Sequence, residues 1–549
     1  MSIAPGKAKR RILPRWRASG KAARSADFSA LKPARFAPVD VNGLVRKARL
    51  DFELEPSVGT AAEMMTAASL AGDDTTARQA ALFLLDDRAA TPGALASMAR
   101  LIVGEEAFGH RISEQEKTSE IRRLLRINGA NPMLWSDLAR HFASIGRKEK
   151  AQRCMSVALS MAPDHRWMLR TAARFLVHQE DSAAAHRLLA NHPKTRSDPW
   201  LLAAELACAQ VAGRAPKHWG AANDLLRRRS HSPEHSSELA AAVAMLELEG
   251  GNRKGARKAV FRALEAPTEN TLAQVSWAMA QQRLQDGFGL EALVQRTSDA
   301  YEADCRLRLA EGDLLGALGA AETWREDEPF AARPCAEIAF IASLIDDHER
   351  TAEMANCVSL LDGHLELNVE MNCLFSKLSS GNLSQDRDGR ELDRIRGRLL
   401  EAMEQGGEAA YHAIANMGLW EYRYGNPAVG RALYDKAVDI ALKLHQRDTA
   451  AMAAVFGARE AFLASDSAAP AMLARAQVLT KDARNPCCSF ILLKVEALSE
   501  HAEDASTIFS PASASEFIAK VNPPRILRIE KESDRVVMVV SRKLKPPTR

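Results

Sequence analysis

The stretch from Asn131 to His165, NPMLWSDLARHFASIGRKEKAQRCMSVALSMAPDH, holds several side chains that could do chemistry. It contains Trp135, His141 and Cys154, and a His near a Cys could bind a metal or form a nucleophile–base pair. His141 has no carboxylate or Cys at a matching spacing, so we interpret it as an ordinary solvated residue. We therefore do not predict a catalytic site here.

Two other places in the chain carry candidate ligands or thiols. In HSPEH, His231 and His235 are four residues apart, a spacing that suits a metal on a helix, but Pro233 interrupts that helix and the HExxH order is missing. In NPCCSF, Cys487 and Cys488 are adjacent after a proline. A vicinal disulfide or redox role is one interpretation, and a pair of buried thiols at a helix start is the one we favour. None of the 8 Cys forms a CxxC motif, so we predict no metal site.

The short motifs of nucleotide-binding and hydrolytic enzymes are missing. The sequence has no GxxxxGK[ST], no complete GxGxxG, no GxSxG and no pair of carboxylates in a catalytic context. The nearest approach, GFGLEA at residues 287–292, follows a helical pattern rather than a strand. We therefore predict a protein that is not an enzyme and carries no cofactor.

The same opening stretch has a clear helical period. With Pro132 as position 1, apolar or small residues fill positions 4, 7, 8 and 11, then 20, 24 and 27, which places them on one face of each of two helices. Gly146 is expected at the turn between the helices, and Pro163 at the end of the second. The residues in these positions are Trp135, Leu138, Ala139, Phe142, Ala151, Met155 and Ala158.

This 34-residue pattern resembles the tetratricopeptide repeat, in which two antiparallel helices share W-x2-L-G-x2-Y and A-x3-F-x2-A signatures. Ala139 and Met155 stand where the family usually has Gly and an aromatic residue. The resemblance implies that Trp135 is a packing residue. Further copies begin at residue 166, near Ser237 and near Tyr411, and helix–turn–helix patterns also occur at 61–85 and 335–361. We expect residues 200–236 and 376–409 to be irregular insertions or joints, with a break at 379–390.

The two ends of the chain differ from its body. The net charge is +4, yet residues 1–49 carry +11 and residues 520–549 carry +6, so the body between them is acidic. Residues 1–49 lack helical periodicity, which predicts an extended, largely disordered basic arm. RILRIEKESDRVVMVVSRK contains two β-rich runs around a polar turn and predicts a C-terminal β-hairpin.

These patterns predict an all-α solenoid of tetratricopeptide-like helix pairs with four parts. They are the arm at 1–49, a helical array at 50–375, a second array at 391–505 and the hairpin at 520–545. The apolar share of 46% and charged share of 26% are typical of a folded soluble protein. The N-terminus has no apolar leader, and no run of 18 apolar residues occurs, so we expect a cytoplasmic protein that does not bind a membrane.

The resemblance also implies a binding surface. In this family, set positions of the first helix of each repeat line a concave groove that binds ligands. In the first two units of this chain those positions hold Met133, Arg140, Trp167, Arg170, Arg174 and His178. Three arginines would suit a carboxylate-bearing or phosphorylated peptide, or a nucleic-acid backbone. The alternative is that they are ordinary helix surface, in part paired with acids of the body.

The basic arm has two interpretations. Its residues could contact phosphates while the tryptophan stacks on a base, and the residues concerned are Arg10, Arg11, Arg15, Trp16 and Arg17. Alternatively the arm neutralises the protein's own acidic body or docks on an acidic protein partner. We favour the second interpretation because no folded nucleic-acid module accompanies the arm.

The function predicted from the sequence is that of a non-enzymatic scaffold or adaptor. It would hold a protein partner in its groove, with the termini as secondary contacts. Two alternatives stay open: a nucleic-acid-binding helical-repeat protein that uses its basic ends, and a regulatory partner of a neighbouring enzyme such as a nuclease. The identity of the partner and the oligomeric state do not follow from the sequence.

Overall fold

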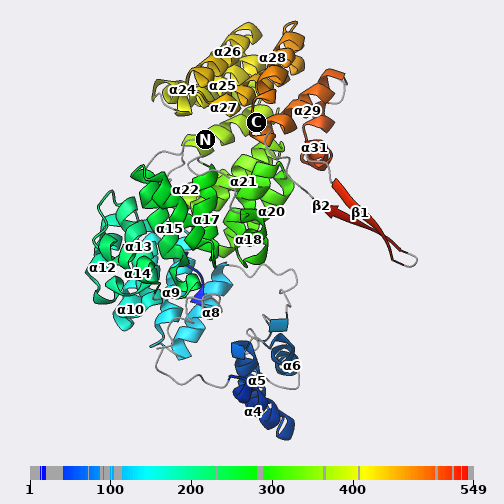
Figure 1. Ribbon diagram of the computed structural model, residues 1–549. Helices are drawn as coiled ribbons and strands as arrows, with labels where there is room; N and C mark the ends of the chain where they lie inside the picture. The colour runs from blue at the N-terminus through cyan, green and yellow to red at the C-terminus, as the bar shows by residue number, and fades with distance from the viewer. Residues whose placement is uncertain are drawn as a thin grey trace. The chain divides into compact units, whose positions relative to one another are not determined.

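The computed structural model describes most of the chain as packed helices (Figure 1). The described residues are 13, 15–19, 41–71, 73–86, 91, 99, 102–103, 114–127, 129–229, 231–280, 289–362, 367–405, 408–500, 505–521, 525–532 and 535–541. They form two compact units. Unit 1 comprises residues 1–17, 142–155 and 162–549, and unit 2 comprises residues 18–141 and 156–161.

Unit 2 contains the helices of the first quarter of the chain. Its helices α5 and α6 pack against each other, as do α4 and α5, and the 61–85 helix–turn–helix prediction is confirmed by α5 and α6. Residues 41–49 were expected to belong to the disordered arm, which is wrong because α4 begins at Val41. The helices are α4 (Val41–Leu54), α5 (Val58–Ala71), α6 (Asp74–Leu85), α8 (Glu114–Ile127) and most of α9 (Pro132–Ser144).

The first half of unit 1 is a series of helices that covers the two copies predicted from residue 166 and near Ser237. Gly146 joins α9 to α10 with a φ of 70°, which glycine adopts without strain, as its place at the turn predicted. The helices are the first part of α10 (Lys148–Met161), α11 (Arg166–His178), α12 (Ser182–Asn191), α13 (Pro199–Val211), α14 (Trp219–Arg228), α15 (Pro233–Glu249), α16 (Arg253–Ala263), α17 (Glu269–Ala280), α18 (Leu290–Arg296), α19 (Tyr301–Glu311) and α20 (Leu314–Asp327).

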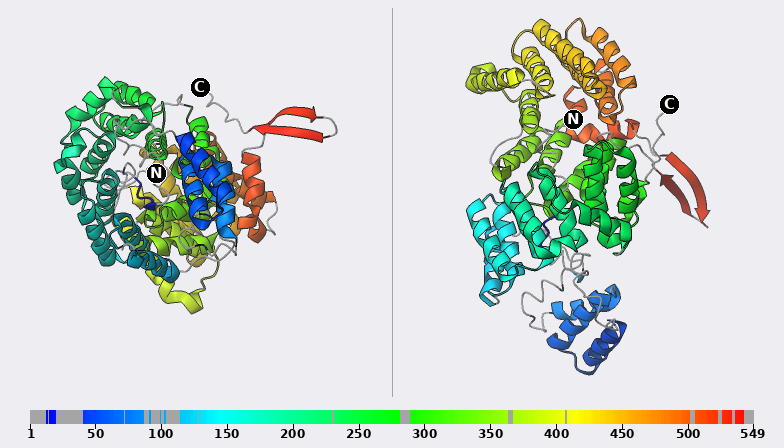
Figure 2. Two further views of the ribbon diagram at one scale, coloured as in Figure 1. Left: turned by 90° about the horizontal axis from the view of Figure 1, so that it is seen from below. Right: turned by 60° about the vertical axis from the view of Figure 1, so that its left-hand side comes forward.

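The second half of unit 1 continues the alternation, and Figure 2 shows successive helices of this unit running side by side. The helices are α21 (Ala332–Leu344), α22 (His348–Asp362), α23 (Leu367–Ser379), α24 (Gln385–Gln405), α25 (Glu408–Tyr424), α26 (Pro427–Lys443), α27 (Arg447–Leu463), α28 (Ala469–Lys481), α29 (Pro486–Glu500), α30 (Ala505–Ile508) and α31 (Ala514–Val521). Strands β1 (Arg525–Glu532) and β2 (Arg535–Ser541) pair antiparallel, with an irregularity in register between Ile526 and Arg528.

The contacts between helices follow a regular rule. Each odd-numbered helix from α11 to α19 contacts the next odd-numbered one, and the same holds from α21 to α29. Most of these helices also contact an even-numbered neighbour in sequence. Two layers of helices arise in this way, an arrangement compatible with a helical repeat protein.

The sequence explains why two of the odd-numbered helices, α13 and α15, lie in the interior. On α13 every residue from Pro199 to Gln210 is buried, and on α15 every residue from Ser236 to Met245 is buried. A helix buried on all sides must approach its neighbours closely, and alanine allows this without loss of helix propensity. The segments 200–236 and 376–409 were expected to be irregular, which is wrong, since α13, α14 and α24 occupy most of them.

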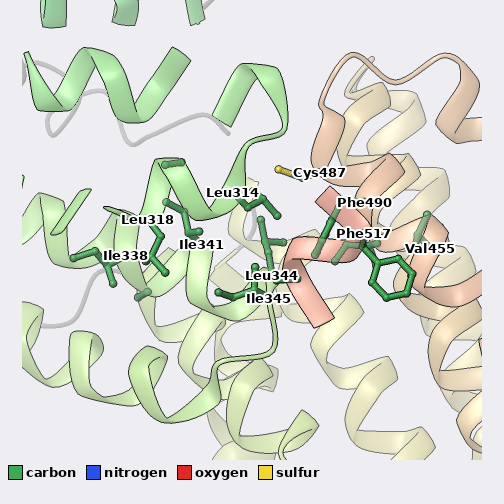
Figure 3. Packing of buried hydrophobic residues seen from close by; sticks show 14 of the residues in the cluster. Leu314, Leu318, Ile338, Ile341, Leu344, Ile345, Val455, Cys487, Phe490 and Phe517 are labelled. Carbon is green, nitrogen blue, oxygen red and sulfur yellow. The ribbon is translucent and has the colours of Figure 1, made fainter. Parts of the chain in front are cut away.

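A large apolar core joins the two halves of unit 1 (Figure 3). Leu314 and Leu318 of α20 pack with Ile338 and Ile341 of α21, and α27, α29 and α31 contribute to the same cluster. Segments more than two hundred residues apart in sequence therefore share one hydrophobic interior.

A buried ionic network ties the same helices together. The Nζ atom of Lys494 lies 2.5 Å from Oδ2 of Asp346, and the Lys494 side chain has no exposed surface. Arg459 lies 3.3 Å from the other oxygen of Asp346 and 2.8 Å from Glu460. Burial lowers the pKa of Lys494, and Asp346 opposes that shift. The turn after α21 thus depends on cations from α27 and α29.

Replacing Asp346 with Asn tests this network. Asn tolerates the positive φ of 62° at this position, so the change removes charge and leaves two buried cations with less compensation. We expect Asp346→Asn to lower the free energy of unfolding by about 3–5 kcal/mol in urea denaturation. The control is Asp347→Asn, where Asn can still cap α22 by accepting from the Arg350 backbone N–H. Equal losses in both variants would contradict the prediction.

Candidate functional site

A short segment near the N-terminus is buried in unit 1. Leu13 is 4% exposed and Trp16 is completely buried. The Trp16 ring meets Phe175 of α11 edge-on at 5.5 Å and Phe330, between α20 and α21, at 4.9 Å. Part of the predicted disordered arm is therefore packed among helices.

The two arginines that flank Trp16 are bound to carboxylates. The guanidinium of Arg15 lies 3.2 Å from Oδ2 of Asp327. Arg17 lies 3.2 Å from Glu269, 3.4 Å from Asp299 and 3.8 Å from Asp327. Asp327 is the last residue of α20, where a negative charge opposes the helix dipole, so nearby cations are favoured.

The carboxylates around Arg15 and Arg17 change the pKa values of both arginines. Burial alone lowers the pKa of Arg15, but the carboxylates of Glu328, Asp327, Glu269 and Glu302 outweigh it and raise that pKa above its usual value. The pKa of Arg17 is raised in the same way, with burial opposed chiefly by Glu269 and Asp327. The segment supplies positive charge to an acidic part of the protein, as the second interpretation of the arm predicted.

A cavity of about 660 Å³ continues from this segment, a size typical of ligand sites. Leu13 and Arg15 form part of its wall, and most of the rest comes from the odd-numbered helices α11, α19, α21, α23, α25, α27 and α29. We call this cavity, together with the place that holds residues 13–17, the unit 1 groove. Its lining comes mainly from the odd-numbered helices of unit 1.

One wall of the groove is charged. Glu302 of α19 lies 3.5 Å from Arg306 and 3.6 Å from Arg333 of α21, and Glu337 lies 2.9 Å from Arg333 and 3.8 Å from Arg306. Burial raises the pKa of Glu302 to about 7, although Arg306 and Arg15 favour its ionised form. The ionisation of this wall therefore changes near neutral pH.

Other residues of the groove lining are apolar. Its aromatic and aliphatic side chains come from α21, α23, α25, α26 and α27, and they include Phe340, Met371, Phe375, Ala415, Tyr434, Met452 and Phe456. A ligand with a charged end and an apolar end would match the two walls. Within the described residues, no group of three or more His, Cys, Asp or Glu is arranged to hold a metal ion.

Two of the six predicted groove residues line the cavity. Arg174 lies over the Phe330 ring at 5.0 Å, and His178 meets the same ring edge-on at 5.6 Å. Both therefore surround the ring that packs on Trp16. Both residues lie on α11.

The other four predicted groove residues lie elsewhere. Arg170 was expected in the groove, but it is buried in an ion pair with Glu238 at 2.7 Å and stacks on Trp200 at 4.7 Å. Trp167 is only 4% exposed. The prediction is wrong for these two because α11 is buried on more sides than a surface helix would be. Met133 and Arg140 are half-buried on α9, in unit 2.

The structure also shows the role of the residues in the opening stretch. Trp135 is half-buried, and its indole N–H donates to the Gly129 carbonyl at 2.8 Å. His141 was interpreted as solvated, which is wrong, because it is 7% exposed and lies 2.6 Å from the Thr118 hydroxyl. Cys154 is buried, as a packing residue would be. The six other residues of the repeat pattern are all buried.

The remaining candidates fit their structural interpretations. Helix α15 begins at Pro233, so His231 lies before it and the two histidines do not share a helix face. Cys487 and Cys488 are buried free thiols at the start of α29, and burial raises the pKa of Cys487 to about 12. Among the arm residues proposed to contact nucleic acid, Arg15, Trp16 and Arg17 are buried in this conformation, and Arg10 and Arg11 lie outside the described residues.

Sequence reasoning missed the acidic and aromatic partners of the N-terminal segment. Asp327, Phe330 and Glu269 belong to no motif and lie more than 250 residues from Trp16 in sequence. The only signal was the opposite charge of the arm and the body.

No protein-family model matches this sequence, and no curated protein was found to match it. In the described helices, none combines the length and apolar character needed to cross a membrane. The interpretation of the site therefore depends on its own geometry.

Replacing Glu302 with Gln tests the charged wall. Because the pKa of Glu302 in the folded protein, about 7, exceeds its ordinary value of 4.5, the folded state binds more protons between these values, and stability falls as pH rises through them. Because Gln does not ionise, Glu302→Gln removes this pH-dependent loss of stability. The free energy of unfolding of Glu302→Gln, measured relative to that of the wild type, should therefore rise by about 2–3 kcal/mol from pH 5 to pH 8.

Urea denaturation at both pH values measures this gain. Glu249→Gln, an exposed position at the end of α15, controls for the substitution itself. A difference between Glu302→Gln and the wild type that stays constant from pH 5 to pH 8 would show that Glu302 does not titrate in this window.

Proposed function

We propose that this protein is a non-enzymatic scaffold or adaptor, built as a tetratricopeptide-like helical array, that binds an extended segment of a partner protein in the unit 1 groove. The observation that carries the proposal is that the groove already holds Leu13 and residues 15–17 of the chain itself, through contacts of their side chains. Stacked helix pairs with an inner layer of first helices are suited to this kind of recognition.

The dimensions and chemistry of the groove support a peptide ligand. Beside the segment it leaves about 660 Å³ of space, with a charged wall around Glu302 and Arg333 and an apolar wall around Phe375 and Phe456. Charged groups at one end orient a ligand, whereas buried apolar contacts supply most of the affinity.

The structure weakens the argument for a nucleic-acid ligand that the basic N-terminal arm gave in the sequence. The guanidinium groups of Arg15 and Arg17 are paired with carboxylates, and Trp16 has no exposed face to stack on a base. A protein ligand is therefore the function that the groove supports best.

Filling the groove tests the proposal. Ala336 lies on the cavity wall between the charged and apolar parts, and Ala336→Trp should reduce capture of the partner at least tenfold. The matched control is Ala474→Trp on the exposed face of α28, which lies outside the cavity. Because Ala336 packs against the apolar core, circular dichroism must show that Ala336→Trp keeps the helical content of the wild type.

Affinity capture from native lysate with quantitative mass spectrometry is the measurement. A stoichiometric protein retained by the wild type and by Ala474→Trp, and lost with Ala336→Trp, would support the groove as the binding site. Equal retention by all three proteins would exclude it.

A further inference from the structure

The place that holds residues 13–17 is chemically specific. It offers three carboxylates, those of Asp327, Glu269 and Asp299, around two aromatic rings, Phe175 and Phe330. The carboxylates select cations, and the rings select a flat apolar side chain between them. This arrangement fits an aromatic residue with an arginine on each side.

Residues 15–17 belong to no helix or strand. Their side chains insert into a surface formed by helices and the turns between them, in the manner of a bound peptide. A segment with the same side chains in another protein could make the same contacts.

We propose that Leu13 and residues 15–17 are an internal ligand, and that the unit 1 groove exchanges them for a partner segment in which an aromatic residue lies between two arginines. The inference rests on the proposed function and specifies its ligand and its regulation. The protein's own segment then holds the site closed until such a partner arrives.

Competition explains why the cavity beside the segment matters. A tethered segment has an effective concentration of the order of mM. A partner that makes only the same contacts therefore cannot displace the segment when the partner's own concentration is lower than that. The cavity continues from Leu13 toward Phe340 and Phe375. A partner with apolar residues before its Arg–aromatic–Arg motif gains contacts there, whereas the chain itself has the basic run KAKRR at residues 7–11.

The test uses the full chain, folded first and then cut. The recognition sequence of a site-specific protease is inserted between Ala23 and Ser29, and the purified, folded protein is then cleaved there. The probe is a fluorescein-labelled peptide of residues 11–19, RILPRWRAS, and its control carries Arg15→Glu, Trp16→Ala and Arg17→Glu.

In fluorescence anisotropy we expect the probe to bind the cut protein after its N-terminal fragment dissociates on dilution. Binding to the uncut protein should be at least tenfold weaker, and the control peptide should not bind the cut protein. Circular dichroism should show the same helix content before and after cleavage.

Three outcomes would overturn the inference. They are a fragment that stays bound and never exchanges with excess probe, a loss of helix content when the fragment leaves, and a dimer in which one copy's N-terminal segment fills the other copy's groove. The first two make the segment a fixed part of the fold, and the third assigns the site to self-association. None of these outcomes predicts the result of the capture experiment with Ala336→Trp. Failure of this inference is therefore distinguishable from failure of the proposed function.

Discussion

The carboxylate of Asp327 is the constraint on which the groove depends. It has no exposed surface, and it ends a helix whose dipole disfavours negative charge there. A charge in that position persists only with cations beside it, because an unpaired buried charge is costly. Arg15 and Arg17 supply those cations, and Trp16 between them fills the apolar space around Phe330. One residue at the end of α20 thus determines what kind of segment can occupy this part of the groove.

A second set of buried charges acts in the same way farther along the chain. Asp346 lies in the turn after α21, and its partners come from α27 and α29. Both sets join segments that are distant in sequence through charge rather than through apolar packing alone. Geometric demands on an ion pair are strict, so such pairs fix the relative placement of the helices that carry them more sharply than alanine-rich faces can.

Local features were predictable from the sequence, and long-range ones were not. The repeat spacing around Gly146 predicts α9 and α10, since helical period and turn chemistry are encoded within a few residues. His178 and Arg174 lie at the end of α11 and line the cavity, whereas the other residues predicted from the same pattern do not. Arg170 was misplaced because periodicity shows which face of a helix is apolar but not whether a second layer covers the polar face. The pairing of Trp16 with Phe330 has no local signal at all, and only the charge asymmetry between arm and body pointed toward it.

The distance in sequence between Arg15 and its partner has a consequence for synthesis. The two ion-paired residues are 312 positions apart. At roughly 5–20 residues per second, a ribosome takes about 15–60 s to make the intervening chain. During that time the Arg15–Trp16–Arg17 segment has been made but its acidic site has not. The nascent protein therefore passes through an interval in which the basic segment is available to any acidic surface nearby, before its own helices enclose it.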